Sequence, residues 1–253
     1  MLAGLVRTLA AYRPERLPVV LPIAGGCAAF LGADVSPSRA VGLGMSGPVA
    51  SSEIDVLEDF YRSRGMPVRI LVSPFADPSL FEQLGAHGFR LVELDSMLMR
   101  RIEPGELIPS PSADVVVRLA RPEEAASWVS TSLEAMLESP DPPRPEIVEI
   151  FSASFHTASS RYFFASIGGV VAGTGALDTH GGAAYLFAAG TLPISRRRGA
   201  QGATIGARLA AAQAAGCDVC FSRTAAGSSS QRNLERWGFR SIYSRATMIK
   251  RFD

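Results

Sequence analysis

The sequence predicts an α/β protein made of two similar halves. Short apolar segments typical of strands alternate with helical segments along the 253 residues. The same order of elements recurs about 150 residues apart, and a stretch rich in proline separates the two occurrences. These observations predict domains at residues 1–103 and 113–253, joined by a linker at residues 104–112.

The repeated unit is a helix, a strand, a short helix and a second strand. In the first half these elements are expected at residues 53–64, 68–73, 78–86 and up to residue 100. In the second half they are expected at residues 203–215, 218–222, 229–236 and up to residue 251. A Gly-Phe-Arg triplet follows each short helix, with Phe89 in one half and Phe239 in the other. The constant order and spacing favour a true repeat over chance.

The second half begins with elements that the repeat does not contain. Helices are expected at residues 121–136 and 145–157, and strands at residues 162–167, 170–177 and 183–189. Gly168-Gly169 is typical of a hairpin turn between the first two strands. In the first half, Ser51 or Ser52 is expected to cap the helix at residues 53–64, because serine accepts hydrogen bonds from the first free amides.

Composition excludes several classes of function. Hydrophobic residues make up 47% and charged residues 19% of the chain, and a net charge of +1 argues against a broad nucleic-acid surface. The apolar run at residues 17–32 is too short and too interrupted by proline and glycine for a membrane helix. Three cysteines suggest a reducing compartment, and the pair Cys217 and Cys220 lacks the further ligands of a zinc site. We therefore expect a soluble cytoplasmic protein without a metal, a membrane or a nucleic-acid partner.

A basic, glycine-containing segment at residues 191–203 is suited to a diphosphate. An apolar strand leads into Arg196, Arg197 and Arg198, then into Gly199 and an alanine-rich helix. Glycine allows the backbone to approach a ligand closely, and the first amides of a helix form an anion site at the positive end of its dipole. The alternative is an ordinary strand-turn-helix joint with solvated arginines.

This segment and its context resemble the GNAT superfamily of acyl-CoA-dependent N-acyltransferases. The family pattern Q/R-x-x-G-x-G/A is matched by Arg196 and Gly199, with Gln201 where glycine or alanine is usual. The helix that follows and the late Gly238-Phe239 also match. The resemblance covers about residues 114 to 253, and the first half is similar to a degenerate copy without the basic loop at residues 196–199. For both halves the resemblance implies a mostly antiparallel mixed sheet flanked by helices.

The resemblance implies acetyl-CoA, or another short acyl-CoA, as co-substrate in direct acetyl transfer to a primary amine of a small molecule or peptide. It implies these cofactor-binding residues: Ala189, Gly190, Thr191, Arg196, Arg197, Arg198, Gly199, Ala200, Gln201, Gly202, Ala203, Ser229, Ser230 and Asn233. Ser228 lies in the same segment as the last three. For these serines, capping of the short helix is the alternative. A homodimer is one option for the assembly.

The catalytic candidates are Tyr185, Asn233 and Glu134. Leu234 occupies the position where many family members have a tyrosine that protonates the leaving thiolate, and the adjacent Asn233 can only hydrogen-bond. Tyr185 stands where a glutamate base is often found, and a phenol is a poor base at neutral pH that is better suited as an acid or to orient water. A sheet aromatic is the alternative. Glu134, Glu138 and Asp141 lie where the family often binds acceptors, although most such carboxylates are simply solvated.

Two rival functions remain open. The segment Gly42 to Gly47 matches the dinucleotide fingerprint G-x-G-x-x-G of an NAD-binding oxidoreductase. The expected helix starts several residues too late, however, and no ribose-binding acid follows the strand at residues 68–73. The other rival is a non-catalytic acyl-CoA-binding sensor or scaffold, suggested by Leu234.

Overall fold

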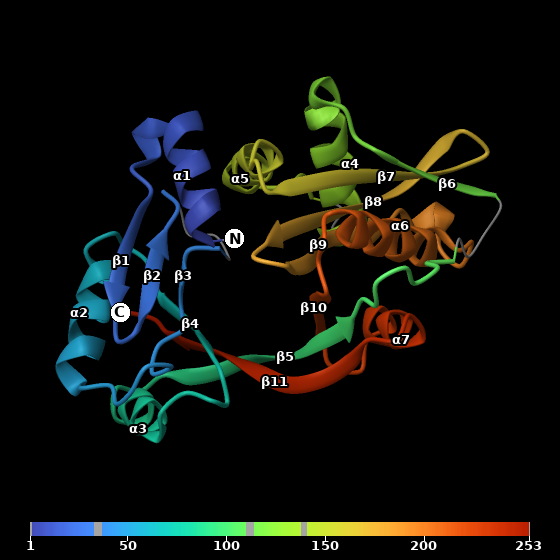
Figure 1. Cartoon of the computed structure of the whole chain (residues 1–253). Coiled ribbons are helices and arrows are strands. Elements are labelled where there is room, and N and C mark those ends of the chain that lie inside the picture. Colours follow the sequence, from blue (N-terminus) through green and yellow to red (C-terminus); the bar gives the residue numbers. More distant parts are fainter. Residues whose placement is uncertain (1, 33–36, 110–113, 138–140, 253) are drawn as a thin grey trace. The chain divides into compact units, whose positions relative to one another are not determined.

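The computed structural model describes residues 2–32, 37–109, 114–137 and 141–252 (Figure 1). The chain divides into two compact units, which we call unit 1 (Met1–Asp95 with Tyr243–Asp253) and unit 2 (Ser96–Ile242). Each contains a mostly antiparallel mixed sheet with helices, so the predicted α/β class is confirmed. No helix within the described ranges is long and apolar enough to cross a membrane.

Unit 1 holds the first elements of the chain. They are α1 (Leu2–Tyr12), the 3-10 helix η1 (Pro14–Arg16), β1 (Val19–Ile23), β2 (Gly26–Phe30), β3 (Arg39–Val41), α2 (Ser51–Arg62), β4 (Val68–Val72) and α3 (Pro78–Ala86). Its sheet has the order β1-β2-β3-β4, followed by residues 243–250 of β11 (Arg240–Lys250) and residues 90–95 of β5 (Arg90–Arg101).

Unit 2 contains the elements after β5 up to the start of β11. They are β6 (Val115–Leu119), η2 (Pro122–Glu124), α4 (Ala125–Leu137), α5 (Pro145–Phe155), β7 (Ser160–Ile167), β8 (Val170–His180), β9 (Ala183–Thr191), η3 (Pro193–Ser195), α6 (Ala200–Ala214), β10 (Val219–Ala225) and α7 (Ser229–Arg236). Its strands follow the order β5-β10-β9-β8-β7-β6, with residues 96–101 supplying the part of β5.

The last strand of each sequence half ends in the unit that the other half builds: residues 96–101 of β5 belong to unit 2, and residues 243–250 of β11 belong to unit 1. In unit 1, β11 pairs antiparallel with β4, with Met248 opposite Ile70, and Met248 packs against the core there. In unit 2, the fully buried Leu98 of β5 joins a core cluster with Phe239 and Leu234. The two compact units are therefore defined by pairing between strands that are far apart in sequence. The boundary at residues 104–112 concerns the sequence repeat, and it stays a prediction.

A buried carboxylate fastens β11 within unit 1. Glu58 of α2 lies 2.7 Å from Lys250 Nζ and 3.0 Å from His87 Nδ1, and its side chain is 5% exposed. Arg62 contacts the other oxygen of the same carboxylate at 3.2 Å. A buried charge is tolerated when it is paired and hydrogen-bonded. Lys250, near the chain's end, thus completes a charge cluster built by α2 and α3.

The predicted cap of α2 was wrong. Ala50 occupies the N-cap position, and its amide donates to Glu53 Oε2 at 2.9 Å. Ser51 is the first helical residue, and its hydroxyl instead forms a hydrogen bond with His87 Nε2 at 3.0 Å. Glu53 reaches back from the first turn and accepts a hydrogen bond from the Ala50 amide. The helix therefore begins at Ser51, two residues before the predicted start at residue 53, and both serines are helical residues.

The glycine-rich turn at residues 42–47 serves packing within unit 1. The amide of Gly44 donates to Ala24 O at 2.9 Å, and Gly44 O accepts from Asp77 N at 2.8 Å. Both backbone groups of Gly44 are therefore engaged by neighbouring turns. The helix begins at Ser51, beyond the glycines, so its free amides do not belong to this turn.

Alternate residues of β7 pack on opposite faces of the unit 2 sheet. Tyr162 and Phe164 pack with Trp128 of α4, whose indole Nε1 donates to Phe163 O at 3.0 Å. Phe163 packs in a cluster with Leu209 of α6. Since successive strand residues point to opposite faces, α4 and α6 cover opposite sides of the sheet. Figure 1 shows α4, α5 and α6 around strands β7 to β9.

The first part of the predicted linker packs against α6. Gln213 Nε2 donates to the carbonyls of Glu103 and Glu106, at 3.1 and 3.0 Å. Glu106 also pairs with Arg100, and Ile108 packs on the cluster that contains Leu98. Residues 104–109 are therefore held by unit 2, while residues 110–112 of the predicted linker lie outside the described chain.

The exchange of strands predicts different costs for two leucines of β5. We expect Leu98→Ala to lower the free energy of unfolding by about 2 to 5 kcal/mol, since it empties a fully buried core position. Leu91→Ala, on the same strand but 54% exposed, should change it by less than about 0.5 kcal/mol. Urea unfolding followed by circular dichroism measures both, and equal effects would contradict the placement of β5.

Candidate functional site

Two neighbouring strands of unit 2 separate part of the way along their length. β9 and β10 pair in parallel only from Ala183 opposite Val219 to Leu186 opposite Ser222. Beyond these residues β9 continues to Thr191 and β10 to Ala225. Beyond Leu186 the edge of β9 that faces β10 is therefore no longer paired with that strand. Backbone amides and carbonyls of β9 lie at a gap between the two strands there.

A bulge in β9 accompanies this separation. Phe187 is opposite Ala176 and Gly190 is opposite Thr174, so β9 has one residue more than β8 over this interval. Ala188 has a φ of +44°, a conformation that residues with a side chain rarely adopt. A bulge bends its strand and leaves backbone groups without ladder partners.

A buried arginine of α6 binds the carbonyls around the bulge. Arg208 Nη1 lies 3.2 Å from Ala176 O and 3.4 Å from Phe187 O, and its Nε donates to Thr204 O at 3.0 Å. Gly175 makes room for it, because a Cβ there would lie 3.1 Å from Arg208 Cζ. Burial lowers the pKa of Arg208 to about 10, so the guanidinium remains charged at neutral pH.

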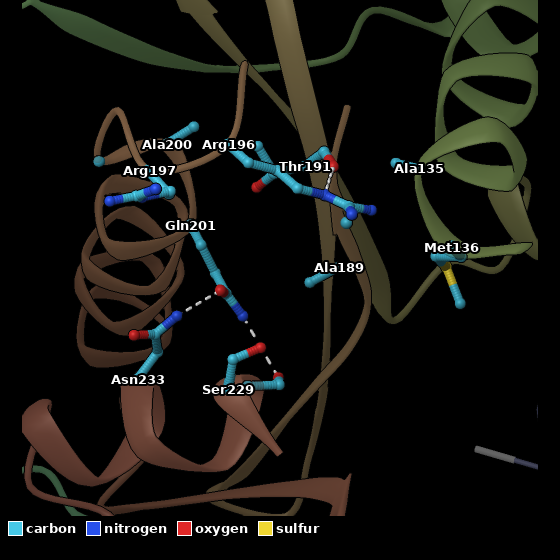
Figure 2. Close-up of a pocket in the computed structure, with 13 residues that line it drawn as sticks. Ala135, Met136, Ala189, Thr191, Arg196, Arg197, Ala200, Gln201, Ser229 and Asn233 are labelled. Atoms are coloured by element: carbon cyan, nitrogen blue, oxygen red, sulfur yellow. Dashed lines mark hydrogen bonds between the residues drawn. The ribbon is translucent and has the colours of Figure 1, made fainter. Parts of the chain in front are cut away.

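A cavity of about 610 Å³ opens beside the end of β9, and we call it the larger cavity (Figure 2). It is bounded by the end of α4, the end of β9, the basic loop and the first turns of α6 and α7. Its lining residues are Ala135, Met136, Ala189, Gly190, Thr191, Arg196, Arg197, Gly199, Ala200, Gln201, Ser229, Ser230 and Asn233. Among the described residues that line it, none carries a negative charge.

The basic loop ends in a helix start with unpaired amides. Gly199, with a φ of +85°, is the N-cap of α6, which runs for 15 residues from Ala200. The amide of Ala203 already donates to Gly199 O at 3.0 Å. The earlier amides, of Ala200, Gln201 and Gly202, have no acceptor within the helix and lie at the positive end of its dipole. The first turn of α6 therefore favours an anion.

The helix thus starts three residues before the predicted Ala203, a correction with a local cause. Gly199 adopts the left-handed conformation that turns the chain into the helix, which glycine does without strain. Arg197 is also left-handed, with a φ of +63°. A residue with a side chain held in this region is strained, and such strain is concentrated at functional sites.

A network of side chains ties α6 to α7 at the cavity wall (Figure 2). Gln201 Nε2 donates to Ser230 Oγ at 3.2 Å, and Asn233 Nδ2 donates to Gln201 Oε1. Arg236 in turn donates to Asn233 Oδ1 at 2.7 Å. Both polar ends of Asn233 are therefore occupied. Gln201, where the resemblance expects glycine or alanine, connects the two helices.

The serines before α7 divide their roles. Ser228 is the N-cap, and its Oγ accepts a hydrogen bond from Gln231 N at 3.1 Å. Ser229 and Ser230 line the larger cavity. The capping alternative thus holds for one serine, and the other two are placed where a ligand in the cavity would meet them.

A second cavity of about 160 Å³, which we call the smaller cavity, lies where β9 and β10 part. It shares Met136, Ala189, Gln201 and Ser230 with the larger one. The rest of its lining is Tyr185, Leu186, Phe187, Ala188, Ile205, Arg208, Ser222, Arg223 and Leu234. The two cavities therefore adjoin along the end of β9.

Most of the predicted binding residues come together, but the catalytic candidates do not. Arg198, Gly202 and Ala203 are absent from the lining of both cavities. Tyr185 lines the smaller cavity and stacks on Phe187, with ring centroids 6.1 Å apart.

The carboxylate candidates lie elsewhere. Glu134 is exposed and lines neither cavity, and the same is true of Asp141. Glu138 lies outside the described residues. The three catalytic candidates Tyr185, Asn233 and Glu134 are therefore spread over a cavity wall, a hydrogen-bond network and an exposed helix face.

Ala135, Met136 and Arg208 are among the lining residues that the sequence did not predict. Ala135 and Met136 come from α4, far from the basic loop in sequence. Arg208 had a usable signal, since it is a charged residue among the apolar residues of an otherwise alanine-rich helix. A charge on a helix face predicted to be buried is a recognised indication of function.

Comparisons with known proteins identify the fold. No protein-family model and no curated protein matches the sequence. The structure resembles a GCN5-related N-acetyltransferase from Kribbella flavida, with 18% identity and a TM-score of 0.70 over 98% of this chain and 96% of that one. It also resembles a putative acetyltransferase of the GNAT family from Novosphingobium aromaticivorans, with 17% identity and a TM-score of 0.58 over 98% and 97% of the two chains.

A tandem GNAT protein from the clavulanic acid biosynthesis pathway is also similar, with 14% identity and a TM-score of 0.57. That likeness covers 76% of this chain and 66% of that one. At identities this low, the structural likeness establishes the architecture alone: the chain has the GCN5-related N-acetyltransferase fold.

The close approach of α4 to β9 predicts the effect of a single methyl group. A Cβ at Gly190 would lie 2.7 Å from Ala135 Cβ and 3.1 Å from Ala135 C, so Gly190→Ala must push α4 away. We expect it to lower the free energy of unfolding by about 1 to 3 kcal/mol. Gly85→Ala, in α3 with nothing near its added Cβ, should be neutral or stabilising. Thermal unfolding compares the stabilities of the two variants. A free energy of unfolding that Gly190→Ala leaves unchanged would contradict the close packing of α4 against β9.

Proposed function

We propose that this chain, which has the GCN5-related N-acetyltransferase fold, is an acyl-CoA-dependent N-acyltransferase. The simplest reaction is acetyl transfer from acetyl-CoA to a primary amine of a small molecule or peptide. One observation carries the proposal: an anion-favouring helix start adjoins the exposed edge of a parted strand within a single cavity. CoA has the matching chemistry, because it joins a pyrophosphate to a long, uncharged arm that contains amides.

The pyrophosphate end is supported by the first turn of α6. Ala200 and Gln201, two of the residues whose amides have no acceptor within the helix, line the larger cavity with Gly199, Arg196 and Arg197. Arg196 Nε also donates to Thr191 O at 3.4 Å, which holds its guanidinium at the cavity wall. Arginine forks match phosphate oxygens in geometry and charge. With no acidic side chain among the described lining residues, this end of the cavity attracts an anion.

The arm of the cofactor is supported by β9. Gly190 and Thr191 pair with β8 on one side, whereas the other edge of β9 has left β10. An extended chain with amide groups can bind such an edge as an added strand would, through main-chain hydrogen bonds. Ala189, Gly190 and Thr191 would then hold the arm, and the thioester would reach the smaller cavity.

The chemistry requires a neutral amine to attack the thioester carbonyl and the CoA thiolate to leave. Leu234 lies buried in the smaller cavity and cannot donate a proton. The phenol of Tyr185 lines the same cavity and could protonate the thiolate or orient a water. Asn233 is engaged by Gln201 and Arg236, which favours a structural and binding role for it.

A non-catalytic acyl-CoA-binding sensor is the second candidate function. The observation that favours it is Leu234, which is 3% exposed at the place where a proton donor would be expected. Attack on a thioester is electronically easy once an amine is positioned, so the enzyme remains the first choice. Both functions share the CoA site and differ in whether an amine releases the thiol.

CoA binding tests the site shared by both candidates. We expect Arg197→Glu to raise the dissociation constant for CoA by about tenfold or more, because each hydrogen bond to a charged group contributes about 1.5 to 3 kcal/mol. Arg240→Glu, with the same charge change at an exposed position outside both cavities, should leave it unchanged. Isothermal titration calorimetry measures both. An unaltered dissociation constant in Arg197→Glu would count against the larger cavity as the CoA site.

Thiol release separates the enzyme from the sensor. We expect free CoA to appear when acetyl-CoA is mixed with a panel of primary amines, and Tyr185→Phe to lower kcat by about a hundredfold with a smaller change in KM. Tyr243→Phe, which removes a hydroxyl from unit 1, is the matched control. Tight CoA binding without release by any amine would favour the sensor.

A further inference from the structure

The smaller cavity contains a buried positive charge without a negative partner. Arg208 is 2% exposed, and it forms no ion pair with any carboxylate in the described part of the chain. The cavity is also lined by Arg223, and by no aspartate or glutamate among the residues described. Burying a charge in apolar surroundings is costly unless a partner compensates it. The arrangement is therefore incomplete without an anion.

The guanidinium has donors left for such an anion. Its hydrogen bonds to Thr204 O, Ala176 O and Phe187 O leave from Nε and Nη1. No hydrogen bond from Nη2 is found among the described residues, and Nη2 is not one of the fully buried polar atoms that lack a partner, so part of this nitrogen is accessible. Arg208 lines the smaller cavity, where an anion could reach it. The carbonyls satisfy hydrogen bonds and hold the group in place, but they carry no net charge.

The other walls suit a small carboxylate. Ile205 and Leu234 are buried and apolar, which lowers the local dielectric and strengthens an ion pair. Ser230 and Tyr185 contribute hydroxyl groups. A volume of about 160 Å³ accommodates a short group of a few heavy atoms. An acetyl methyl group needs none of this charge.

We propose that the smaller cavity is a carboxylate subsite, in which Arg208 binds a carboxylate carried by one of the two substrates. The inference rests on the proposed acyl transfer and names the class of substrate. The carboxylate belongs either to the acyl group, as in a malonyl or succinyl thioester, or to an amino-acid acceptor. The guanidinium then has two tasks: Nε and Nη1 support the bulge of β9, and Nη2 recognises the substrate.

The first experiment uses the wild-type protein and so does not depend on the folding of a variant. Calorimetry compares malonyl-CoA and succinyl-CoA with their ω-methyl esters and with acetyl-CoA. We expect at least one acid to bind about tenfold or more tightly than its ester, since a hydrogen-bonded charge pair contributes at least that much. Equal dissociation constants for each acid and its ester exclude the acyl group as the source of the carboxylate.

The second experiment assigns the effect to Arg208. We expect Arg208→Met to abolish the preference for the acid and Arg208→Lys to keep part of it, while Arg240→Met, a charge removed from an exposed position, keeps all of it. Acetyl-CoA binding in each variant reports whether the larger cavity is intact. A preference that survives Arg208→Met overturns the proposal.

A parallel arm examines the acceptor. With acetyl-CoA as donor, amino acids are compared with their amides for thiol release by the wild-type protein. Faster thiol release with the amino acids than with their amides supports the subsite and places the carboxylate on the acceptor, provided that Arg208→Met abolishes the difference. No discrimination in either arm, in a protein that binds CoA, overturns the subsite alone. Failure to bind any CoA thioester overturns the proposed function together with the subsite.

Discussion

The site depends on how a β-sheet is opened without leaving backbone groups unsatisfied. Where β9 bulges at Ala188 and parts from β10, the ladder that would bind its carbonyls is interrupted. Arg208 supplies the missing donors from α6, and Gly175 leaves the space in which the guanidinium lies. An unpaired buried carbonyl costs free energy comparable to a lost hydrogen bond, so the gap between the strands persists because these groups are paired.

One helix therefore supports both cavities. The start of α6 presents unpaired amides to the larger cavity, and Arg208, two turns further along, supports the bulge and lines the smaller one. On the other side of the gap, β10 is held by β5, whose Leu98 packs with Cys220 and Phe239. β10, which parts from β9 on one edge, is thus paired with β5 on its other edge. β5 is a segment of the first sequence half.

Predicted and observed elements agree best where neighbouring residues in the chain determine the ends of the element. The short helices at Pro78–Ala86 and Ser229–Arg236 are found with the predicted bounds. Each is capped by a side chain immediately before it, Asp77 or Ser228, and followed by a glycine with positive φ. The starts of α2 and α6 were misplaced, because Glu53 and Gly199 decided them through backbone contacts that the apolar pattern does not report.

By itself, the sequence determined the α/β class, the order of the elements and the basic loop that precedes α6, because these depend on residues close together in the chain. Glycine conformations, unpaired helix amides and apolar periodicity are all local properties. Only the tertiary structure decided that the C-terminal parts of β5 and β11 lie in each other's unit, that Asn233 is engaged by Gln201, and that Arg208 reaches the bulge of β9. These contacts join segments far apart in sequence, and the free energy that selects them comes from burial and pairing that exist only once the sheet has formed.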